Sequence, residues 1–208
     1  MSQTTLRRTV GAGRAARIAG DEVASLVERA AAGDERAWHE LVAEFSGLVW
    51  AVARAHRLRE ADAAEVAQIT WTRLVENVDR LHDPARVGPW LATTARRECL
   101  RVLRQGARVV PRGDDEFLDD VSDAPEHGAA LMQQERDAVL WKAFESQRPR
   151  DRALLRMLVN DPSPSYEEIS EALDMPVGSI GPTRARALER LRREVESLGV
   201  TADTVHWR

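Results

Sequence analysis

The sequence predicts an all-α protein made of two helical domains. Apolar residues recur at three- and four-residue spacings through most of the chain, and no stretch alternates with period two for long enough to form a sheet. Residues 106–128 combine charge with two prolines and three glycines and few apolar residues. We interpret this stretch as a flexible acidic linker between the two domains, because such a composition does not support a packed core.

Composition limits the classes of protein to which the chain can belong. It has 208 residues, of which 43% are hydrophobic and 31% charged, with no apolar run long enough to cross a membrane and no signal-peptide core. We therefore expect a cytoplasmic protein with no membrane span. The lone Cys99 and five scattered histidines offer no disulfide framework, metal site or catalytic constellation. We expect no metal, no cofactor and no enzymatic activity.

The predicted first domain covers residues 21–105 and follows an N-terminal arm, residues 1–20. A helix is expected from Asp21, with Gly33 as its stop and Asp34 as the N-cap of the next. A third helix is predicted over 61–77. The pairs Asp83-Pro84 and Gly88-Pro89 then bracket a predicted loop, and a fourth helix carries an apolar face from Trp90 to Leu103.

The predicted second domain covers residues 129–198, and a tail follows over 199–208. Ser165 and Glu168 form a capping box that starts a short helix, and residues 174–176 make a turn before a second apolar stripe. This pattern predicts a helix-turn-helix, in which the second helix lies in the DNA major groove. Its outward face carries donors suited to base edges and phosphates: Ser179, Thr183, Arg184, Arg186 and Arg190. A plain αα-hairpin with a solvated arginine face is the alternative.

Basic residues gather in two places although the net charge is −4. Residues 96–112 hold six arginines and one acid, and residues 184–193 hold five arginines and one acid. Two local basic faces of this kind are typical of contact with phosphates, so we expect a nucleic-acid partner despite the overall acidity.

Two segments resemble a known family. SYEEISEALDMPVGSIGPTRARALERLRREV (165–195) resembles the minus-35-reading region of bacterial extracytoplasmic-function RNA polymerase sigma factors, a group of the sigma-70 family. DAAEVAQITWTRLVENVDRLHDPARVGPWLATTARRECLRVLR (62–104) resembles the segments that bind core polymerase and read the minus-10 element. The resemblance implies an alternative sigma factor that recruits core polymerase, through its beta-prime clamp and beta flap, to promoter DNA and opens the strands there.

The resemblance also implies roles for individual residues. Polymerase contact falls on Asp62, Glu65, Gln68 and Trp71. Contact with the minus-10 region falls on His82, Arg86, Trp90, Arg97, Arg101 and Arg104. Within these sets the segment 82–87 is expected to capture a flipped base, and the last three arginines to contact phosphates. A core position is the alternative for both tryptophans.

The sequence departs from the family pattern at two places. Arg97-Glu98 stands where the family often has Asn, and Gly181-Pro182 replaces basic and Ser residues of the recognition helix. Because proline is unfavourable inside a helix, we expect the recognition helix to begin late or to kink near 179–182.

Other functions and partners stay open from the sequence. A stand-alone helix-turn-helix regulator is the alternative function. Whether a separate anti-sigma protein binds the chain is not decided by the sequence. We also expect a closed arrangement of the two domains that hides both basic faces, so that the fragment 129–208 binds a minus-35 duplex more tightly than the free full chain.

Overall fold

The structure is a computed structural model, and it describes residues 19–106 and 129–199. Every regular element within these residues is helical, which confirms the all-α prediction. In chain order the helices are α1 (Gly20–Ala31), α2 (Glu35–Ala55), α3 (Glu60–Asn77), α4 (Val87–Gly106), α5 (Ala129–Glu145), α6 (Pro149–Leu158), α7 (Tyr166–Leu173) and α8 (Val177–Ser197). Two short 3-10 helices, η1 (Val78–Arg80) and η2 (Pro84–Arg86), connect α3 to α4.

The predicted cap between the first two helices is present. Asp34 Oδ1 accepts hydrogen bonds from the amides of Arg36, at 2.9 Å, and Ala37, at 3.3 Å. Gly33 just before it has a φ of +89°, a conformation that glycine adopts without a steric penalty. The local sequence therefore fixes the corner between α1 and α2, as expected.

Two predicted helix starts are wrong by several residues. Helix α4 begins at Val87, so Gly88 and Pro89 lie in its first turn and not in the preceding loop. A proline is accepted there because the first amides of a helix have no intrahelical partner. Helix α8 begins at Val177 and does not start late, so Pro182 lies inside the helix. The alternative expectation, a kink near 179–182, stays a prediction.

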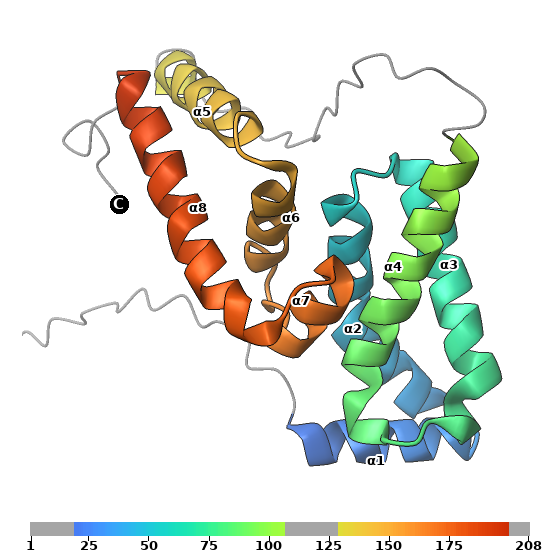
Figure 1. Ribbon diagram of the computed structural model, residues 1–208. Helices are drawn as coiled ribbons and strands as arrows, with labels where there is room; N and C mark the ends of the chain where they lie inside the picture. Colours follow the sequence, from blue (N-terminus) through green and yellow to red (C-terminus); the bar gives the residue numbers. More distant parts are fainter. Residues whose placement is uncertain (1–18, 107–128, 200–208) are drawn as a thin grey trace, which may run out of the picture.

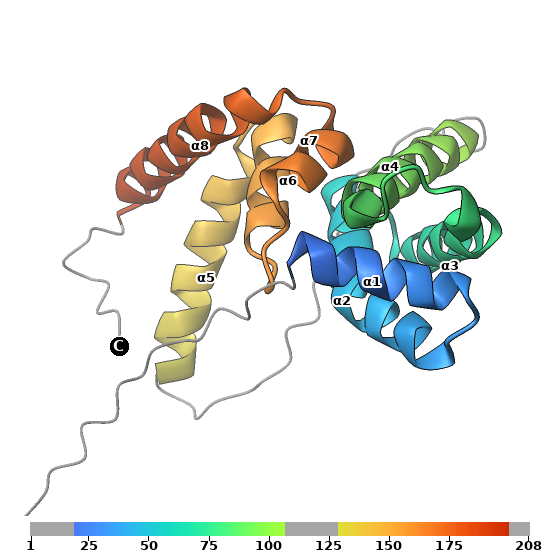
Figure 2. The ribbon, with the colours of Figure 1, turned by 90° about the horizontal axis from the view of Figure 1, so that it is seen from below.

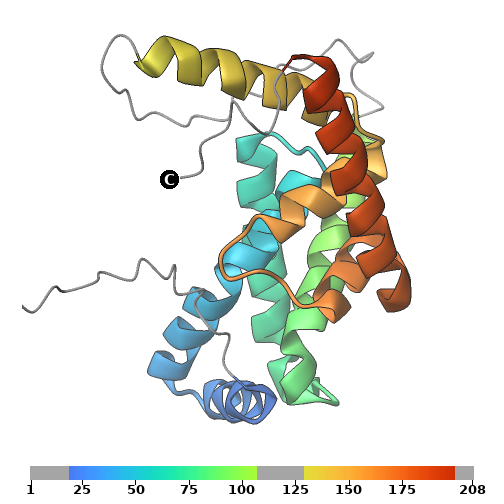
Figure 3. The same ribbon diagram turned by 90° about the vertical axis from the view of Figure 1, so that its left-hand side faces the viewer.

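The helices divide into an N-terminal half, α1–α4, and a C-terminal half, α5–α8. In the N-terminal half α2, α3 and α4 run side by side, and α1 crosses one end of them (Figures 1 and 3). In the C-terminal half α6 and α7 lie against α2 and α4, whereas α5 and most of α8 extend away from them (Figures 1 and 2). The helix-turn-helix is thus attached to the N-terminal half through its first helix.

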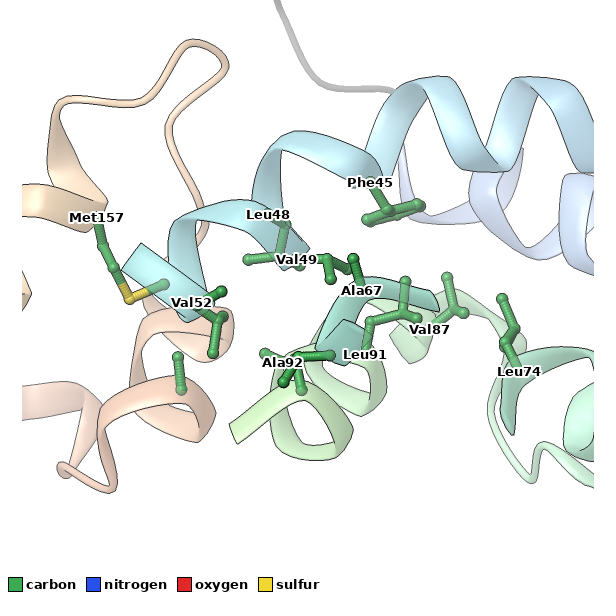
Figure 4. Close-up of a cluster of buried hydrophobic side chains, with 14 of the residues drawn as sticks. Phe45, Leu48, Val49, Val52, Ala67, Leu74, Val87, Leu91, Ala92 and Met157 are labelled. Atoms are coloured by element: carbon green, nitrogen blue, oxygen red, sulfur yellow. The ribbon is translucent and has the colours of Figure 1, made fainter. Parts of the chain in front are cut away.

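One cluster of buried apolar side chains runs through both halves. It includes Val52 of α2 and Leu91 of α4, and it continues into Met157 of α6 and Ile169 of α7. Met157 lies next to Val52 across the boundary between the halves (Figure 4). The division at 106–128 remains a prediction, since that stretch after Gly106 lies outside the described residues, as do the arm before residue 19 and the tail after residue 199.

Candidate nucleic-acid interface

Helices α7 and α8 form the predicted helix-turn-helix. Glu168 donates its amide to Ser165 Oγ at 3.2 Å, and its Oε2 accepts from the Ser165 amide at 2.7 Å, which confirms the capping box. Asp174 ends α7 with a φ of 54°, a left-handed conformation that Asp tolerates better than most residues. Ser170 closes the turn, because its carbonyl accepts from the Met175 amide at 3.2 Å and its Oγ donates to the Met175 carbonyl at 2.7 Å.

The predicted DNA-reading residues at the start of α8 face outward. Arg184 and Arg186 are exposed, and Ser179 and Thr183 are partly exposed. Arg186 Nε donates to the Pro182 carbonyl at 3.2 Å, a contact within the helix that leaves most of the guanidinium donors available. Four of the five predicted residues on this helix are therefore accessible to a groove of DNA.

Arg190, the fifth predicted residue, is engaged inside the C-terminal half. Its Nη2 donates to Asp151 Oδ2 on α6, and the Asp151 side chain is only 6% exposed. A buried carboxylate needs such a partner, because desolvation of an unpaired charge is strongly unfavourable. The contact gives Arg190 a structural role that the sequence did not indicate, and contact with DNA stays a prediction.

The predicted phosphate contacts on α4 differ from one another. Arg97 and Arg104 are exposed, and Arg104 Nε donates to the Leu100 carbonyl of its own helix at 3.0 Å. Arg101 instead donates to the buried Glu98 at 2.7 Å and lies 3.5 Å from Glu65 of α3. The hydrogen bond that Arg101 donates to Glu98 raises the pKa of Arg101 above its ordinary value. Arg101 thus joins α4 to α3 through carboxylates.

The segment that precedes α4 keeps its predicted polar side chains on the surface. His82 and Arg86 are exposed, and Asp83 caps η2 by accepting from the Ala85 amide at 3.2 Å. Arg86 lies 3.6 Å from Glu167 of α7. The segment is therefore ordered next to the helix-turn-helix, a proximity that no sequence pattern indicated.

The two tryptophans are neither buried nor fully exposed. Trp71 and Trp90 both pack partly against the apolar cluster and keep part of their surface in solvent. Asp62, also a predicted polymerase contact, is partly exposed on α3, and Glu65 and Gln68 are exposed on the same helix. The core and contact interpretations of the tryptophans therefore both remain compatible with their positions.

The remaining chemistry-bearing groups do not form a site. Cys99 is buried, and burial raises the pKa of its thiol to about 12, so the thiol is protonated at neutral pH. Across residues 19–106 and 129–199 there is no group of three His, Cys, Asp or Glu side chains placed to hold a metal ion. The same residues contain no helix that is long and apolar enough to cross a membrane.

Polar contacts between the two halves were missed by the sequence interpretation. Each joins a donor of the N-terminal half to an acceptor of the C-terminal half. The pairs are Arg54 with Asn160, His56 with the Ala172 carbonyl, Arg57 with Glu145, Arg86 with Glu167, Thr93 with Glu171, and Arg96 with Asp174. The sequence signal that could have indicated these contacts was charge. Acidic residues recur along α7 at helical spacing, and basic residues lie just before α4 and along it.

Comparison with known proteins finds similarity to one family. Residues 41–109 match the family description "Sigma-70 region 2". The chain is 25% identical over 183 residues to the ECF RNA polymerase sigma-E factors of Escherichia coli (strain K12) and Salmonella typhimurium (strain LT2). Each alignment covers 83% of this chain and 94% of the relative.

A solved structure shares the fold. It is described as "Structure of CnrH in complex with the cytosolic domain of CnrY", and the matched chain superposes with a TM-score of 0.54 at 20% identity. The superposition covers 84% of this chain and 97% of that chain. The region 2 match in the N-terminal half, the helix-turn-helix in the C-terminal half and the named relatives agree. Residues 41–109 thus resemble sigma-70 region 2, and over most of its length the chain is similar to extracytoplasmic-function (ECF) RNA polymerase sigma factors.

Proposed function

We propose that the chain binds the core of RNA polymerase, directs it to a two-part promoter and assists strand opening without catalysis of its own. The observation that carries this proposal is the exposed donor face of α8, on Arg184 and Arg186, in a chain whose residues 41–109 match sigma-70 region 2. A helix-turn-helix alone would support only DNA binding. The region 2 match supports polymerase as the partner, and in this proposal the chain acts in the cytoplasm, where polymerase and promoters meet.

In this proposal the two predicted domains divide the promoter between them. Residues 21–105 act at the minus-10 element, where His82 and Arg86 precede α4, Trp90 stacks on an unpaired base and Arg97 and Arg104 contact phosphates. The exposed positions of both arginines on α4 support this part.

The second domain, residues 129–198, reads the minus-35 element through α8. Ser179, Thr183, Arg184 and Arg186 contact base edges and nearby phosphates, and their outward placement supports this assignment. Pro182 lies inside α8 and has no amide proton, so one intrahelical hydrogen bond is missing next to the proposed reading residues.

Polymerase contact falls on α3 in this proposal. Asp62, Glu65, Gln68 and Trp71 place carboxylate, amide and aromatic groups on a helix that is free along one side, a surface suited to helix-on-helix docking. The CnrH structure contains the cytosolic domain of CnrY. By analogy, a segment of a second protein is a further partner to test, by co-purification with this chain.

In vitro transcription with purified core polymerase tests the proposal. Genomic promoter fragments should give transcripts with the chain and none without it. The double variant Arg184→Ala, Arg186→Ala should lose this activity. Its matched control, Arg192→Ala with Arg193→Ala, removes the same charge from side chains that are 70% and 73% exposed and paired within α8, and should keep it. Absence of transcripts with every fragment contradicts the proposal.

The stand-alone regulator is not favoured, because it does not account for the region 2 match. It makes a different prediction: tight, sequence-specific duplex binding by the free chain, unaffected by core polymerase. A gel-shift titration with and without core polymerase separates the two functions.

A further inference from the structure

Three acceptors follow one side of α7 and its C-cap. Glu167, Glu171 and Asp174 are spaced by four and three residues, which places them on one side of a helix. We call them the α7 acidic stripe. They face three donors that belong to η2 and α4, the elements assigned above to the minus-10 region. The contacts are Arg86 to Glu167 at 3.6 Å, Thr93 to Glu171 at 2.7 Å and Arg96 to Asp174 at 2.8 Å.

Close packing holds the stripe in place. Helix α7 lies alongside α4 in both views of the molecule (Figures 1 and 2). Ile169 and Ala172 of α7 are fully buried in the shared cluster. Gly88, in the first turn of α4, has no room for a side chain, since a Cβ there would lie 2.1 Å from Glu168 Oε1. Helices α7 and α4 therefore form a closely packed interface.

The stripe also resembles a nucleic-acid strand chemically. Its carboxylates present a row of anionic acceptors to guanidinium and hydroxyl donors, as the phosphates of a strand do. Of the donors it occupies, Arg86 is a residue to which the proposed function assigns the promoter strand, and Thr93 and Arg96 lie on α4 between the assigned residues Trp90 and Arg97. A strand that follows α4 therefore meets carboxylates where it needs cations.

The second reading face is not covered in the same way. Arg184 and Arg186 of α8 remain exposed in the closed arrangement. This differs from the expectation that closure hides both basic faces, and it removes the reason to expect tighter minus-35 binding by the fragment 129–208. Closure acts on the minus-10 side of the molecule.

We propose that α7 is an internal competitor of the promoter strand: in the free chain its acidic stripe occupies the DNA-facing edge of η2 and α4. The inference rests on the proposed function for the identity of the displaced ligand. Polymerase favours the open arrangement by binding surfaces of both halves in a separated geometry, and only such differential binding shifts the population. Promoter melting and release of α7 are then coupled.

The test variant neutralises the stripe with little change of shape: Glu167→Gln, Glu171→Gln and Asp174→Asn. Asparagine tolerates the left-handed conformation at position 174, so the turn of the helix-turn-helix is kept. The matched control is Glu28→Gln, Glu40→Gln and Glu76→Gln, which makes the same change of net charge at exposed positions of α1, α2 and α3.

The first measurement is binding of a fluorescein-labelled single-stranded DNA of mixed sequence to the full-length chain at one salt concentration. The stripe variant should bind about three- to tenfold more tightly than the parent, as expected when a few partly exposed ion pairs are removed from a competing state. The control should bind like the parent. Equal affinities of stripe variant and control overturn the proposal.

The second measurement is the distance between the halves by fluorescence energy transfer. Labels are placed at Val75→Cys and Val159→Cys, whose native side chains are 59% and 83% exposed, while the buried Cys99 stays unlabelled. The stripe variant should shift toward longer distances and the control should not. A stripe variant that stays as closed as the parent overturns the proposal.

Transcription assays with core polymerase separate this inference from the function on which it rests. If the parent chain supports transcription but the stripe variant matches the control in both measurements, the inference that α7 competes with the promoter strand is wrong and the proposed function stands. If no chain supports transcription but the stripe variant opens and binds DNA more tightly, the proposed function is wrong and the internal contact stands.

Discussion

Helices α4 and α8 are both long and rich in arginine, but their arginines differ in whether they pair with carboxylates or face solvent. On α4, Arg96 and Arg101 are tied to carboxylates of α7, α3 and α4 itself. On α8, Arg184 and Arg186 have no carboxylate partner among the described residues and face solvent. The difference arises because α4 lies between α2, α3 and α7, whereas α8 extends away from the N-terminal half (Figure 1). Arginine spacing alone does not distinguish a reading face from a set of internal ion pairs.

The largest expected effect concerns Arg190 of α8, which pairs with a buried carboxylate as Arg101 of α4 does. Arg190→Ala leaves the buried Asp151 carboxylate without its partner and should lower the free energy of unfolding by about 2–3 kcal/mol, less than for a fully buried pair because Arg190 is 36% exposed. Urea denaturation measures it. Arg193→Ala is the control and should change little, because its pair with Glu189 is at the surface. Equal midpoints for the two variants would contradict the structural role.

The next prediction disrupts the packing of α4 against α7, the environment that distinguishes α4 from α8. Gly88→Ala places a methyl group against Glu168 and Phe45, and overpacking of this kind costs about 1–3 kcal/mol. The halves should move apart, which energy transfer between the labels at positions 75 and 159 reports. Gly47→Ala on α2, where a Cβ meets nothing within 4 Å, is the matched control. An unchanged distance in the Gly88 variant would mean that the interface accommodates the methyl group.

A third prediction sharpens the assignment of α8 as a reading helix. Arg186→Ala should weaken promoter binding by about 1–3 kcal/mol at the upstream element only, because a groove-facing arginine makes paired hydrogen bonds to guanine. Binding of the polymerase complex to promoter variants measures this. Loss of affinity without any change in sequence preference would remove Arg186 from the reading residues.

A fourth prediction addresses the phosphate contacts of α4. Arg104→Ala should weaken binding almost equally across promoter sequences and reduce the slope of log affinity against log salt by about one. Arg101→Ala should show the same slope change together with lower stability, because Arg101 also binds Glu98. A sequence-selective loss in the Arg104 variant would exclude a purely phosphate role.

The smallest expected effect is on pH dependence. Burial lowers the pKa of His56 below its usual 6.5, aided by the charge of Arg96 and opposed by the hydrogen bond to the Ala172 carbonyl. The closed contact is therefore fully present above pH 6.5 and weakens as the pH falls through the lower pKa of the closed state. Energy transfer against pH measures this. A His56→Gln chain with an unchanged profile would assign the pH dependence to another group.

Local sequence signals predicted the helices and their caps well, but they did not predict side-chain contacts between residues far apart in the sequence. The capping box at Ser165 and the N-cap at Asp34 were readable because the participating residues lie within a few positions of each other. The start of α4 was misplaced because a Gly-Pro pair is tolerated inside the first turn of a helix, and the start of α8 was misplaced because α8 holds Pro182 in its interior. Arg190 with Asp151 and Thr93 with Glu171 are 39 and 78 residues apart, and no local pattern specifies such contacts.

The sequence predicted the outward placement of some candidate DNA-contacting arginines but not the exposure of all of them. The outward face of α8 follows from its apolar stripe, so Arg184 and Arg186 could be placed from the sequence. Arg101 has the same periodic signal on α4, yet its exposure depends on Glu65 of a different helix. Exposure of a cation thus requires the tertiary arrangement.

The apolar cluster shared by the two halves makes opening a thermal as well as an electrostatic event. Separating Met157 and Ile169 from the part of the cluster that belongs to the N-terminal half exposes apolar surface to water, and hydration of apolar surface raises the heat capacity. The apolar contribution to closure therefore weakens on cooling. We expect the free chain to open as the temperature falls. Polymerase then has to supply less free energy to open the chain in the cold than at the temperature at which the closed arrangement is most stable.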